Sequence, residues 1–240
     1  MLGKYNINYE DIGKGKVVIF LHGWGGSIRS FSPIVPHIKC RCISIDFPGF
    51  GESPTCKNMD IYEYAESVYL FLKEKGIHQC DIVAHSFGCR VAIILASLYD
   101  IKIPKMIFTG GAGLKPRKSL VTKCKILRYK LAKRLVKWKL LSSIKLQKFG
   151  SSDYKNLNAD MKRIFTTIVN QHLDYLVPSI KSSVLLVWGE KDKVTPMYVA
   201  KRFENLLKDS GLIVYPHCTH FAYLEKPADF ISLVNYFINQ

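Results

Sequence analysis

Ser86 stands in a run of residues whose types and spacing could make it a nucleophile. Residues 82–88 read Ile-Val-Ala-His-Ser-Phe-Gly, an apolar strand-like run that leads into a helix-like one. A sharp strand–turn–helix that exposes a serine crowds the backbone two positions before and after it, so those positions usually hold glycine. Ala84 replaces the first of these glycines but keeps the small size. The alternative is a serine that simply caps a helix beginning at Phe87.

Two groups that a serine nucleophile requires occur later in the chain. Asp192 and His220 each follow a strand-like run. A histidine can accept the serine proton, and a carboxylate can fix the tautomer of that histidine. The chain order of serine, acid and histidine is one in which such triads occur. Glu190 and His217 are alternatives for the acid and the base, and each of these residues could also be an ordinary turn or loop residue.

A glycine-rich turn follows the strand-like residues 17–21. It reads His22-Gly-Trp24-Gly-Gly. Acyl transfer builds negative charge on an oxygen, and each backbone N–H aimed at that oxygen contributes about 3–4 kcal/mol. A glycine-rich turn can present such donors. The alternatives are a plain turn or a weak phosphate-binding loop, and the absence of a GK[ST] sequence excludes a P-loop.

Strand-like and helix-like segments alternate along most of the chain. The middle strand-like runs are apolar on both faces, which is typical of a parallel sheet covered on each side. This alternation predicts an α/β fold with a doubly wound, mostly parallel sheet. The predicted strands cover residues 7–10, 17–21, 42–46, 81–84, 105–109, 184–188 and 212–215. The predicted helices cover residues 61–75, with Asp60 as N-cap, and residues 87–98, 197–207 and 228–238.

Residues 112–182 interrupt the alternation. No convincing strand occurs there, but apolar residues recur at helical spacing over residues 120–138 and again over residues 160–175. We therefore predict an α/β core formed by residues 1–111 and 183–240. Residues 112–182 would be inserted between two strands of that core as a helical cap.

Together these motifs resemble the α/β-hydrolase superfamily over essentially the whole chain outside the insertion. Residues 46–53, Asp-Phe-Pro-Gly-Phe-Gly-Glu-Ser, are similar to that family's D-x-P-G-x-G-x-S segment. The resemblance implies the α/β-hydrolase fold with a helical cap and a reaction that uses no cofactor. It implies Ser86 as the nucleophile, His220 as the base and Asp192 as the acid that orients the base.

The same resemblance implies roles for a second group of residues. The backbone N–H groups of Trp24 and Phe87 would form the oxyanion hole. His22, Asp46 and Ser53 would support that corner of the fold without taking part in the reaction.

Positive charge is concentrated in the predicted cap. The chain has 35 Lys and Arg against 19 Asp and Glu, a formal net charge of +16. Thirteen of the basic residues and no acidic residue lie in residues 115–148. Two explanations fit this pattern equally well. One is a solvated cationic helix face, and the other is recognition of an acidic carrier protein, an anionic membrane surface or an anionic acyl substrate. Nucleic acid is disfavoured because this segment has few aromatic residues and no nucleic-acid-binding fold is predicted.

Composition excludes several other classes of protein. With 48% hydrophobic and 22% charged residues, the 240-residue chain is not disordered, collagen-like or a coiled coil. Its cysteines are odd in number, seven, and form no CxxC pair, so we expect reduced thiols in a cytoplasmic protein and no metal site. We also expect no signal peptide and no membrane span, because the longest apolar runs are far shorter than a bilayer requires.

These observations predict a serine hydrolase that cleaves a carboxylic ester through an acyl-enzyme. The turn at His22 and the capped layout are similar to those of the esterases that cleave the methyl ester of pimeloyl-acyl-carrier protein, in which a basic cap meets an acidic carrier. Other capped relatives hydrolyse C–C bonds or act as lyases with the same triad, so those reactions stay open. The alternative from another class is a non-catalytic module that docks an acidic partner or a membrane through residues 115–148.

Overall fold

A parallel sheet with one antiparallel edge strand forms the centre of the molecule. The computed structural model describes residues 5–56, 58–117 and 159–240. Within these residues the sheet has seven strands in the order β1-β3-β2-β4-β5-β6-β7, and only β1 runs antiparallel to its neighbour. The strands are β1 (Tyr9–Ile12), β2 (Val17–Leu21), β3 (Arg41–Ile45), β4 (Asp81–His85), β5 (Lys105–Thr109), β6 (Ser183–Gly189) and β7 (Ser210–Tyr215).

The strand order creates a crevice between the carboxyl ends of β2 and β4. The chain leaves β2 toward β3 on one side, whereas it leaves β4 toward β5 on the other. Ligands of open α/β sheets bind at such a reversal because the two connections diverge there. The glycine-rich turn after β2 and Ser86 after β4 therefore flank the same crevice.

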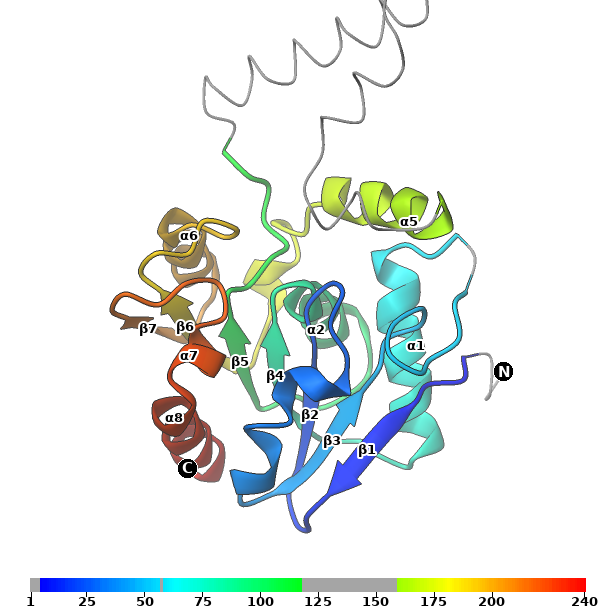
Figure 1. Cartoon of the computed structure of the whole chain (residues 1–240), viewed down its shortest axis with the longest axis horizontal. Helices are drawn as coiled ribbons and strands as arrows, with labels where there is room; N and C mark the ends of the chain where they lie inside the picture. The colour runs from blue at the N-terminus through cyan, green and yellow to red at the C-terminus, as the bar shows by residue number, and fades with distance from the viewer. Residues whose placement is uncertain (1–4, 57, 118–158) are drawn as a thin grey trace, which may run out of the picture.

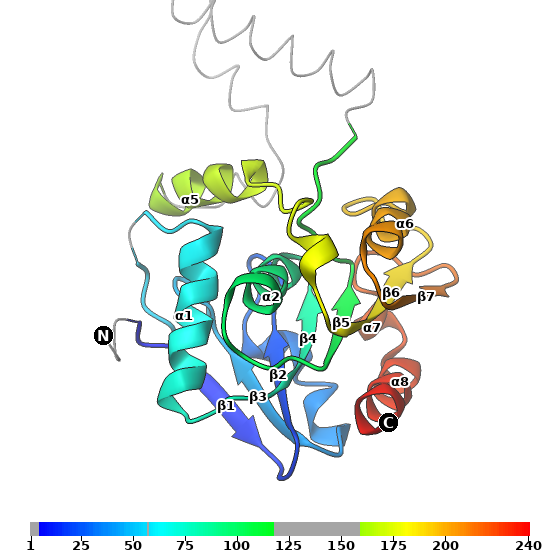
Figure 2. The same ribbon diagram turned by 180° about the vertical axis from the view of Figure 1, so that it is seen from behind.

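Helices cover both faces of the sheet (Figures 1 and 2). Side chains of the central strands alternate between two apolar layers: in β2, Ile19 and Leu21 join the layer under α1, α2 and α6, while Val18 and Phe20 join the layer under α7 and α8. This alternation explains why the predicted middle strands are apolar on both faces. The helices are α1 (Ile61–Glu74), α2 (Phe87–Leu98), α5 (Ala159–Asn170), α6 (Met197–Leu206), α7 (Ala222–Glu225) and α8 (Pro227–Asn239), with short 3-10 turns η1 (Ile28–Phe31), η2 (Val35–His37) and η4 (Val177–Ser179).

The first helix begins where the sequence predicts. The carboxylate of Asp60 accepts hydrogen bonds from the backbone N–H groups of Tyr62 and Glu63, and the Glu63 side chain accepts from the N–H of Asp60. This reciprocal pair satisfies backbone donors that a helix start otherwise leaves free. Asp60 is therefore confirmed as the N-cap of α1.

Two predicted elements have different bounds in the structure. The strand predicted over residues 7–10 lies two residues later, at Tyr9–Ile12, where it pairs with β3. All four of its residues are exposed, so no alternation of apolar side chains marked its position. The helix predicted over residues 160–175 ends at Asn170, because the N–H of Leu173 bonds to the carbonyl of Gly113 and turns the chain back toward the core.

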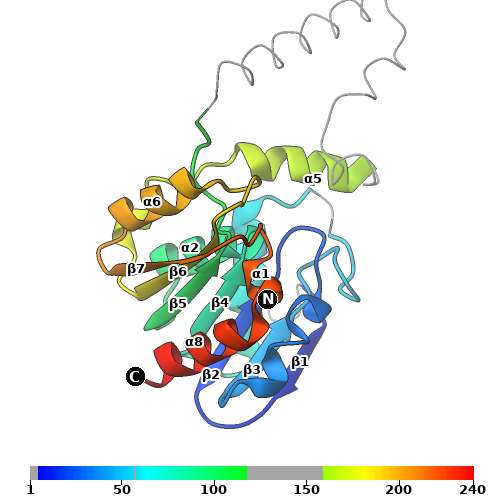
Figure 3. The same ribbon diagram turned by 60° about the vertical axis from the view of Figure 1, so that its left-hand side comes forward.

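Helix α5 lies across the carboxyl ends of the central strands (Figures 1 and 3). It belongs to the segment between β5 and β6 that the sequence predicts as a cap. The predicted helix over residues 120–138, and most of the basic segment 115–148, lie outside the described residues. The domain boundaries thus stay a prediction. Among the helices of the described ranges, none combines the length and the apolar composition needed to cross a membrane.

Candidate active site

Ser86 occupies a strained turn between β4 and α2. Its backbone has φ 47° and ψ −104°, a conformation that residues other than glycine rarely adopt. The turn is held by the N–H of Ser86, which donates to the carbonyl of Thr109 at 3.0 Å. The Ser86 side chain makes no capping hydrogen bond to α2. The alternative of a simple helix-capping serine is therefore wrong, and the strain points to a functional position.

Small residues on either side of Ser86 let α2 approach the sheet closely. A Cβ atom at Gly88 would overlap the carbonyl oxygen of Leu21 in β2. Only glycine fits there. Ala84, which replaces the more usual glycine on the other side, is fully buried in β4 between Leu21 and Phe108 of the neighbouring strands.

Asp192 and His220 form a buried pair beside this turn. Oδ2 of Asp192 lies 2.8 Å from Nδ1 of His220, and the two side chains are 0% and 10% exposed. They come from the loops after β6 and β7, which are adjacent parallel strands. A carboxylate acceptor at Nδ1 holds the ring proton there, so Nε2 keeps its lone pair and can act as a base.

The Asp192 carboxylate is fixed by its own loop. It accepts hydrogen bonds from the N–H of Val194 at 2.8 Å, the N–H of Thr195 at 2.9 Å and the hydroxyl of Thr195 at 2.8 Å. Burial raises the pKa of Asp192, but the hydrogen bonds from His220 and Thr195 outweigh it and leave the pKa below its usual value. The carboxylate is thus ionised and oriented when the imidazole meets it.

Close packing holds the His220 ring in place. A Cβ at Gly110, whose φ is +54°, would lie 2.9 Å from both Cε1 and Nδ1 of that ring. On another side the His85 ring packs against it with centroids 4.8 Å apart, and Nδ1 of His85 bonds to the carbonyl of Thr109 at 3.0 Å. Burial, and then the charge of His220, lower the pKa of His85 to about 3, so His85 is neutral beside an imidazolium.

The alternative acid and base lie elsewhere. His217 and Glu190 face each other at the surface, with Nδ1 and Oε2 3.7 Å apart and side chains 82% and 54% exposed. The backbone N–H of His217 also donates to Glu190 at 2.9 Å. The two residues form an exposed pair of their own, so the geometry favours Asp192 and His220.

The turn after β2 lies against the Ser86 turn. A Cβ at Gly23 would lie 2.8 Å from the His85 ring and 3.5 Å from the Cβ of Ser86. The turn closes through the N–H of Gly26, which bonds to the carbonyl of Gly23 at 3.0 Å. This bond does not use the N–H of Trp24. The first N–H of a helix, here that of Phe87, also has no partner within its helix.

Buried polar residues brace this corner, as the sequence suggests. His22 lies 2.7 Å from the Gly23 carbonyl through Nδ1 and accepts from the N–H of Phe47 through Nε2 at 3.1 Å. Burial lowers the pKa of His22 to about 4, which keeps it neutral. The Asp46 carboxylate accepts from the N–H groups of Ile28 and Glu52 at 2.7 and 2.9 Å. These contacts tie the turn after β2 to the loop after β3.

A pocket opens over Ser86. It encloses about 280 Å³, and its walls come from the turn after β2, the start of α2, the chain leaving β5, α5 and the start of α6. The lining is mostly apolar, with a few polar side chains, which is typical of small-molecule sites. Its residues are Trp24, Ser86, Phe87, Arg90, Ala112, Gly113, Leu114, Pro116, Phe165, Ile168, Val169, Val194, Thr195, Pro196, Tyr198 and Val199.

Comparison with known proteins agrees with this geometry. The chain matches the family described as "alpha/beta hydrolase fold" over residues 16–140 and 162–227. The chain belongs to the α/β-hydrolase family. It is therefore a hydrolase of that fold, as the sequence motifs indicated.

Relatives of this α/β-hydrolase include enzymes with different substrates. The 2-hydroxy-6-oxo-2,4-heptadienoate hydrolase of Pseudomonas putida is 22% identical over 99% of this chain and 94% of that protein. The pimeloyl-[acyl-carrier protein] methyl ester esterase of Neisseria meningitidis is 25% identical over 93% of each. Among solved structures, the meta-cleavage product hydrolase of Pseudomonas fluorescens superposes with a TM-score of 0.74 at 22% identity, covering 98% of this chain and 94% of that one.

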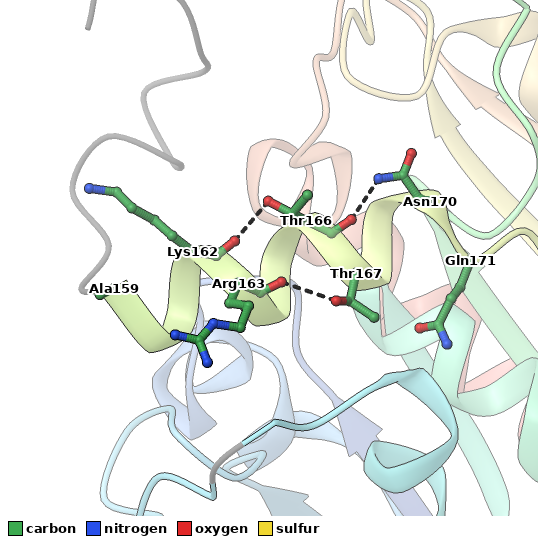
Figure 4. Close-up of a pocket in the computed structure, with 7 residues that line it drawn as sticks. All are labelled: Ala159, Lys162, Arg163, Thr166, Thr167, Asn170 and Gln171. Atoms are coloured by element: carbon green, nitrogen blue, oxygen red, sulfur yellow. Dashed lines mark hydrogen bonds between the residues drawn. The ribbon is translucent and has the colours of Figure 1, made fainter. Parts of the chain in front are cut away.

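A second hollow of this α/β-hydrolase lies along the outer side of α5 (Figure 4). It measures about 660 Å³, but its described walls come from α5 and the residue that follows it. Three of its polar side chains bond their own helix: the hydroxyls of Thr166 and Thr167 donate to backbone carbonyls one turn earlier, and so does the amide of Asn170. Groups satisfied in this way have little to offer a polar ligand. The smaller pocket over Ser86 is the better candidate site.

Two residues of this α/β-hydrolase site were not singled out from the sequence. Thr195 fixes the Asp192 carboxylate, and its position three residues after the acid is a spacing at which such turns form. His85 packs against the base, but it stands at a motif position that accepts many residue types. Only the folded structure shows what it touches.

Proposed function

We propose that this α/β-hydrolase cleaves a carboxylic ester through an acyl-enzyme on Ser86. The observation that carries the proposal is the buried pair formed by Asp192 and His220, with 2.8 Å between Oδ2 and Nδ1, next to the strained Ser86 turn. A serine in such a turn is exposed to substrate, and a base with a fixed tautomer stands beside it. The same arrangement argues against a purely non-catalytic module.

The first half of the reaction forms the acyl-enzyme. Oγ of Ser86 attacks the ester carbonyl carbon while its proton passes to Nε2 of His220. The carbonyl oxygen becomes an oxyanion that accepts hydrogen bonds from the backbone N–H groups of Trp24 and Phe87. Asp192 stabilises the imidazolium. When the C–O bond to the alcohol breaks, His220 protonates the departing oxygen, which leaves alcohol and acyl-Ser86.

The second half releases the acid. A water molecule gives one proton to Nε2 of His220 and attacks the acyl carbon, and the same two N–H groups receive the oxyanion. The bond to Oγ of Ser86 then breaks and His220 returns the proton to that oxygen. The products are a carboxylic acid and the original enzyme, so no cofactor is consumed.

Turnover of a short-chain p-nitrophenyl ester tests this proposal. We expect Ser86→Ala to lower kcat on the order of 10⁶-fold, as in other triad enzymes. The matched control is Ser32→Ala, which changes an exposed serine whose hydroxyl donates to the nearby Arg29 carbonyl; this variant should keep the wild-type kcat. Activity retained by Ser86→Ala would overturn the proposal.

A second candidate is hydrolysis of a C–C bond next to a ketone. It is favoured by relatives named as hydrolases of 2-hydroxy-6-oxo-dienoates, the first of which aligns over nearly the whole of both chains. The same base, acid and N–H donors serve either reaction. Loss of the ultraviolet–visible absorption of a 2-hydroxy-6-oxo-dienoate, measured beside p-nitrophenyl ester turnover, separates the two. A kcat/KM at least about tenfold higher for the dienoate would favour the C–C reaction.

We also propose that the basic segment, residues 115–148, docks an acidic carrier protein. Its thirteen positive residues without one acidic residue support this, as does the relative named for an acyl-carrier-protein ester. Binding should weaken steeply as salt is added. The test is binding of acidic acyl-carrier protein and of anionic phospholipid vesicles at low and high salt; preference for vesicles would show a membrane surface instead.

Charge removal inside and outside the segment provides the control for that test. Replacing Lys133, Arg134 and Lys137 by Gln should weaken carrier binding. Replacing three exposed lysines of the α/β part of the chain by Gln should not weaken carrier binding. Suitable positions are Lys14, Lys39 and Lys208. Equal effects of the two triple variants would show only a general response to net charge.

A cytoplasmic location belongs to the same proposal. In the described residues the cysteines are free thiols, and most of them are buried. Free thiols are usual where the environment is reducing.

A further inference from the structure

Arg90 places a buried cation in the wall of the Ser86 pocket. It lies one helical turn after Ser86 on α2, and it is only 8% exposed. A buried guanidinium is costly unless acceptors and negative charge surround it. The contacts of Arg90 therefore show which of its N–H groups still lack an acceptor and whether a carboxylate balances its charge.

Part of the Arg90 guanidinium is committed to the protein backbone. Nη1 donates to the carbonyl of Ile168 at 3.1 Å and to the carbonyl of Gln171 at 2.7 Å, where α5 ends. These bonds fasten the end of α5 to the helix that carries Ser86. Nε and Nη2 make no hydrogen bond within the part of the chain that the structure describes. Three N–H bonds of the fork are thus available to a ligand.

The carboxylate whose charge most raises the pKa of Arg90 is already engaged. Asp174 raises the pKa of Arg90, yet burial dominates and lowers that pKa to about 10. One oxygen of Asp174 pairs with the guanidinium of Arg202, and the other accepts the N–H of Lys115 at 2.8 Å. Arg90 therefore has no carboxylate of its own among the described residues.

The rest of the pocket lining is neutral. Apart from Arg90, none of the described residues that line it carries a formal charge. Trp24, which also lines it, has a buried indole N–H with no hydrogen-bond partner in the described chain. The pocket thus combines an apolar wall with N–H donors that lack acceptors.

We infer that Arg90 binds a carboxylate at the far end of the acyl group, so that the substrate is an ester or ketone with an apolar body and one terminal anion. Ser86 immediately precedes α2, Arg90 is the fourth residue of that helix, and both line the pocket, so about 6 Å of helix axis separates them. A carboxylate on Arg90 therefore sits a few carbons from the carbonyl that Ser86 attacks. This inference rests on the proposed function for the reacting end of the substrate and adds the recognition of its other end.

Binding to the Ser86→Ala protein tests this inference without turnover. Calorimetry compares monomethyl glutarate, which carries one carboxylate, with the neutral dimethyl glutarate. We expect the monoanion to bind about 10- to 100-fold more tightly, the ratio typical of a hydrogen bond to a charged group. Equal affinities, tighter binding of the diester or no binding of either ester would overturn the inference. The monomethyl esters of succinate and adipate then report the best chain length.

Variants in the same background assign the preference to Arg90. Arg90→Gln should reduce it to within about twofold, and Arg90→Lys should keep part of it because the charge remains. Arg29→Gln is the matched control: this arginine is exposed and does not line the pocket, so the preference should persist. An unchanged preference in Arg90→Gln would overturn the assignment.

Two features of this design separate a failure of the Arg90 inference from misfolding of a variant and from a failure of the proposed reaction. The comparison of the two esters needs no change at Arg90, so it decides even if Arg90→Gln fails to fold. It also needs no catalysis. Loss of ester turnover would overturn the proposed reaction, whereas loss of the anion preference overturns only the role of Arg90.

Discussion

Nδ1 of His220 lies 2.8 Å from Oδ2 of Asp192, although 28 residues separate them in the chain. The two are brought together because β6 and β7 are neighbouring parallel strands, whose following loops emerge side by side. Further contacts make the pair more rigid: Thr195 donates to the Asp192 carboxylate, and the His85 ring packs against the ring of His220. This rigidity is what a base with a single tautomer requires.

Replacing Asp192 by Asn tests the role of the carboxylate. The amide is nearly the same size, but it cannot stabilise an imidazolium and can present a donor to Nδ1 of His220. We expect kcat for an ester to fall on the order of 10⁴-fold. Glu190→Gln, which changes the exposed alternative acid, should leave kcat unchanged. A comparable loss in Glu190→Gln would contradict the assignment.

Gly110→Ala tests the packing around the base. Its new Cβ would lie 2.9 Å from the His220 ring and would also force a positive φ of 54° on alanine. We expect a loss of stability of about 1–2 kcal/mol from the backbone, and a fall in kcat of about 10- to 100-fold from the displaced ring.

Gly76→Ala is the control that separates these two effects. Gly76 has φ +66°, but a Cβ there would meet no atom within 4 Å. The variant should therefore lose similar stability in urea unfolding with kcat unchanged. If both variants lowered kcat equally, the contact with His220 would not be responsible.

Stability should fall as the pH drops below about 6.5. Burial lowers the pKa of His22 to about 4 and that of His85 to about 3, so the unfolded chain takes up protons that the folded chain refuses. The contribution of the two neutral histidines to the free energy of unfolding is therefore fully present above the histidine pKa of the unfolded chain, about 6.5. It is lost as the pH falls from about 6.5 to 4. Each histidine contributes up to about 1.4 kcal/mol per pH unit in that window.

Urea unfolding across that pH range measures the effect. His85→Gln should reduce the slope of unfolding free energy against pH by about one histidine's contribution. His37→Gln, which changes an exposed histidine, should leave the slope as it is. A wild-type free energy that is flat between pH 6.5 and pH 4 would contradict the assigned pKa values.

The sequence was most informative about the middle of the sheet. The strands at residues 17–21 and 105–109 and the helix at residues 87–98 have the predicted bounds, because most of their residues are apolar and buried. The edge strand β1 was displaced by two residues because its side chains are all exposed. In the candidate site, Ser86, Asp192 and His220 were recognisable because their order and their places after strands follow from the fold.

Other parts of the site depend on contacts that no local pattern records. Arg90 follows Ser86 by one turn, but its role arises only where the end of α5 meets α2. Gly110 matters because the loop carrying His220 lies against it, and that loop comes 110 residues later in the chain. The pocket walls combine several distant segments, so the acyl and alcohol groups of the substrate could not be predicted from the sequence.

Covalent labelling of Ser86 tests the central claim most directly. A fluorophosphonate reacts with a serine that a histidine activates, and intact-mass and peptide analysis locates the adduct. We predict one adduct per chain, on the peptide that contains Ser86. Labelling should be absent in Ser86→Ala, strongly slowed in His220→Ala and unchanged in His217→Ala. No adduct on the wild-type protein, or equal labelling after Ser86→Ala, would contradict the account.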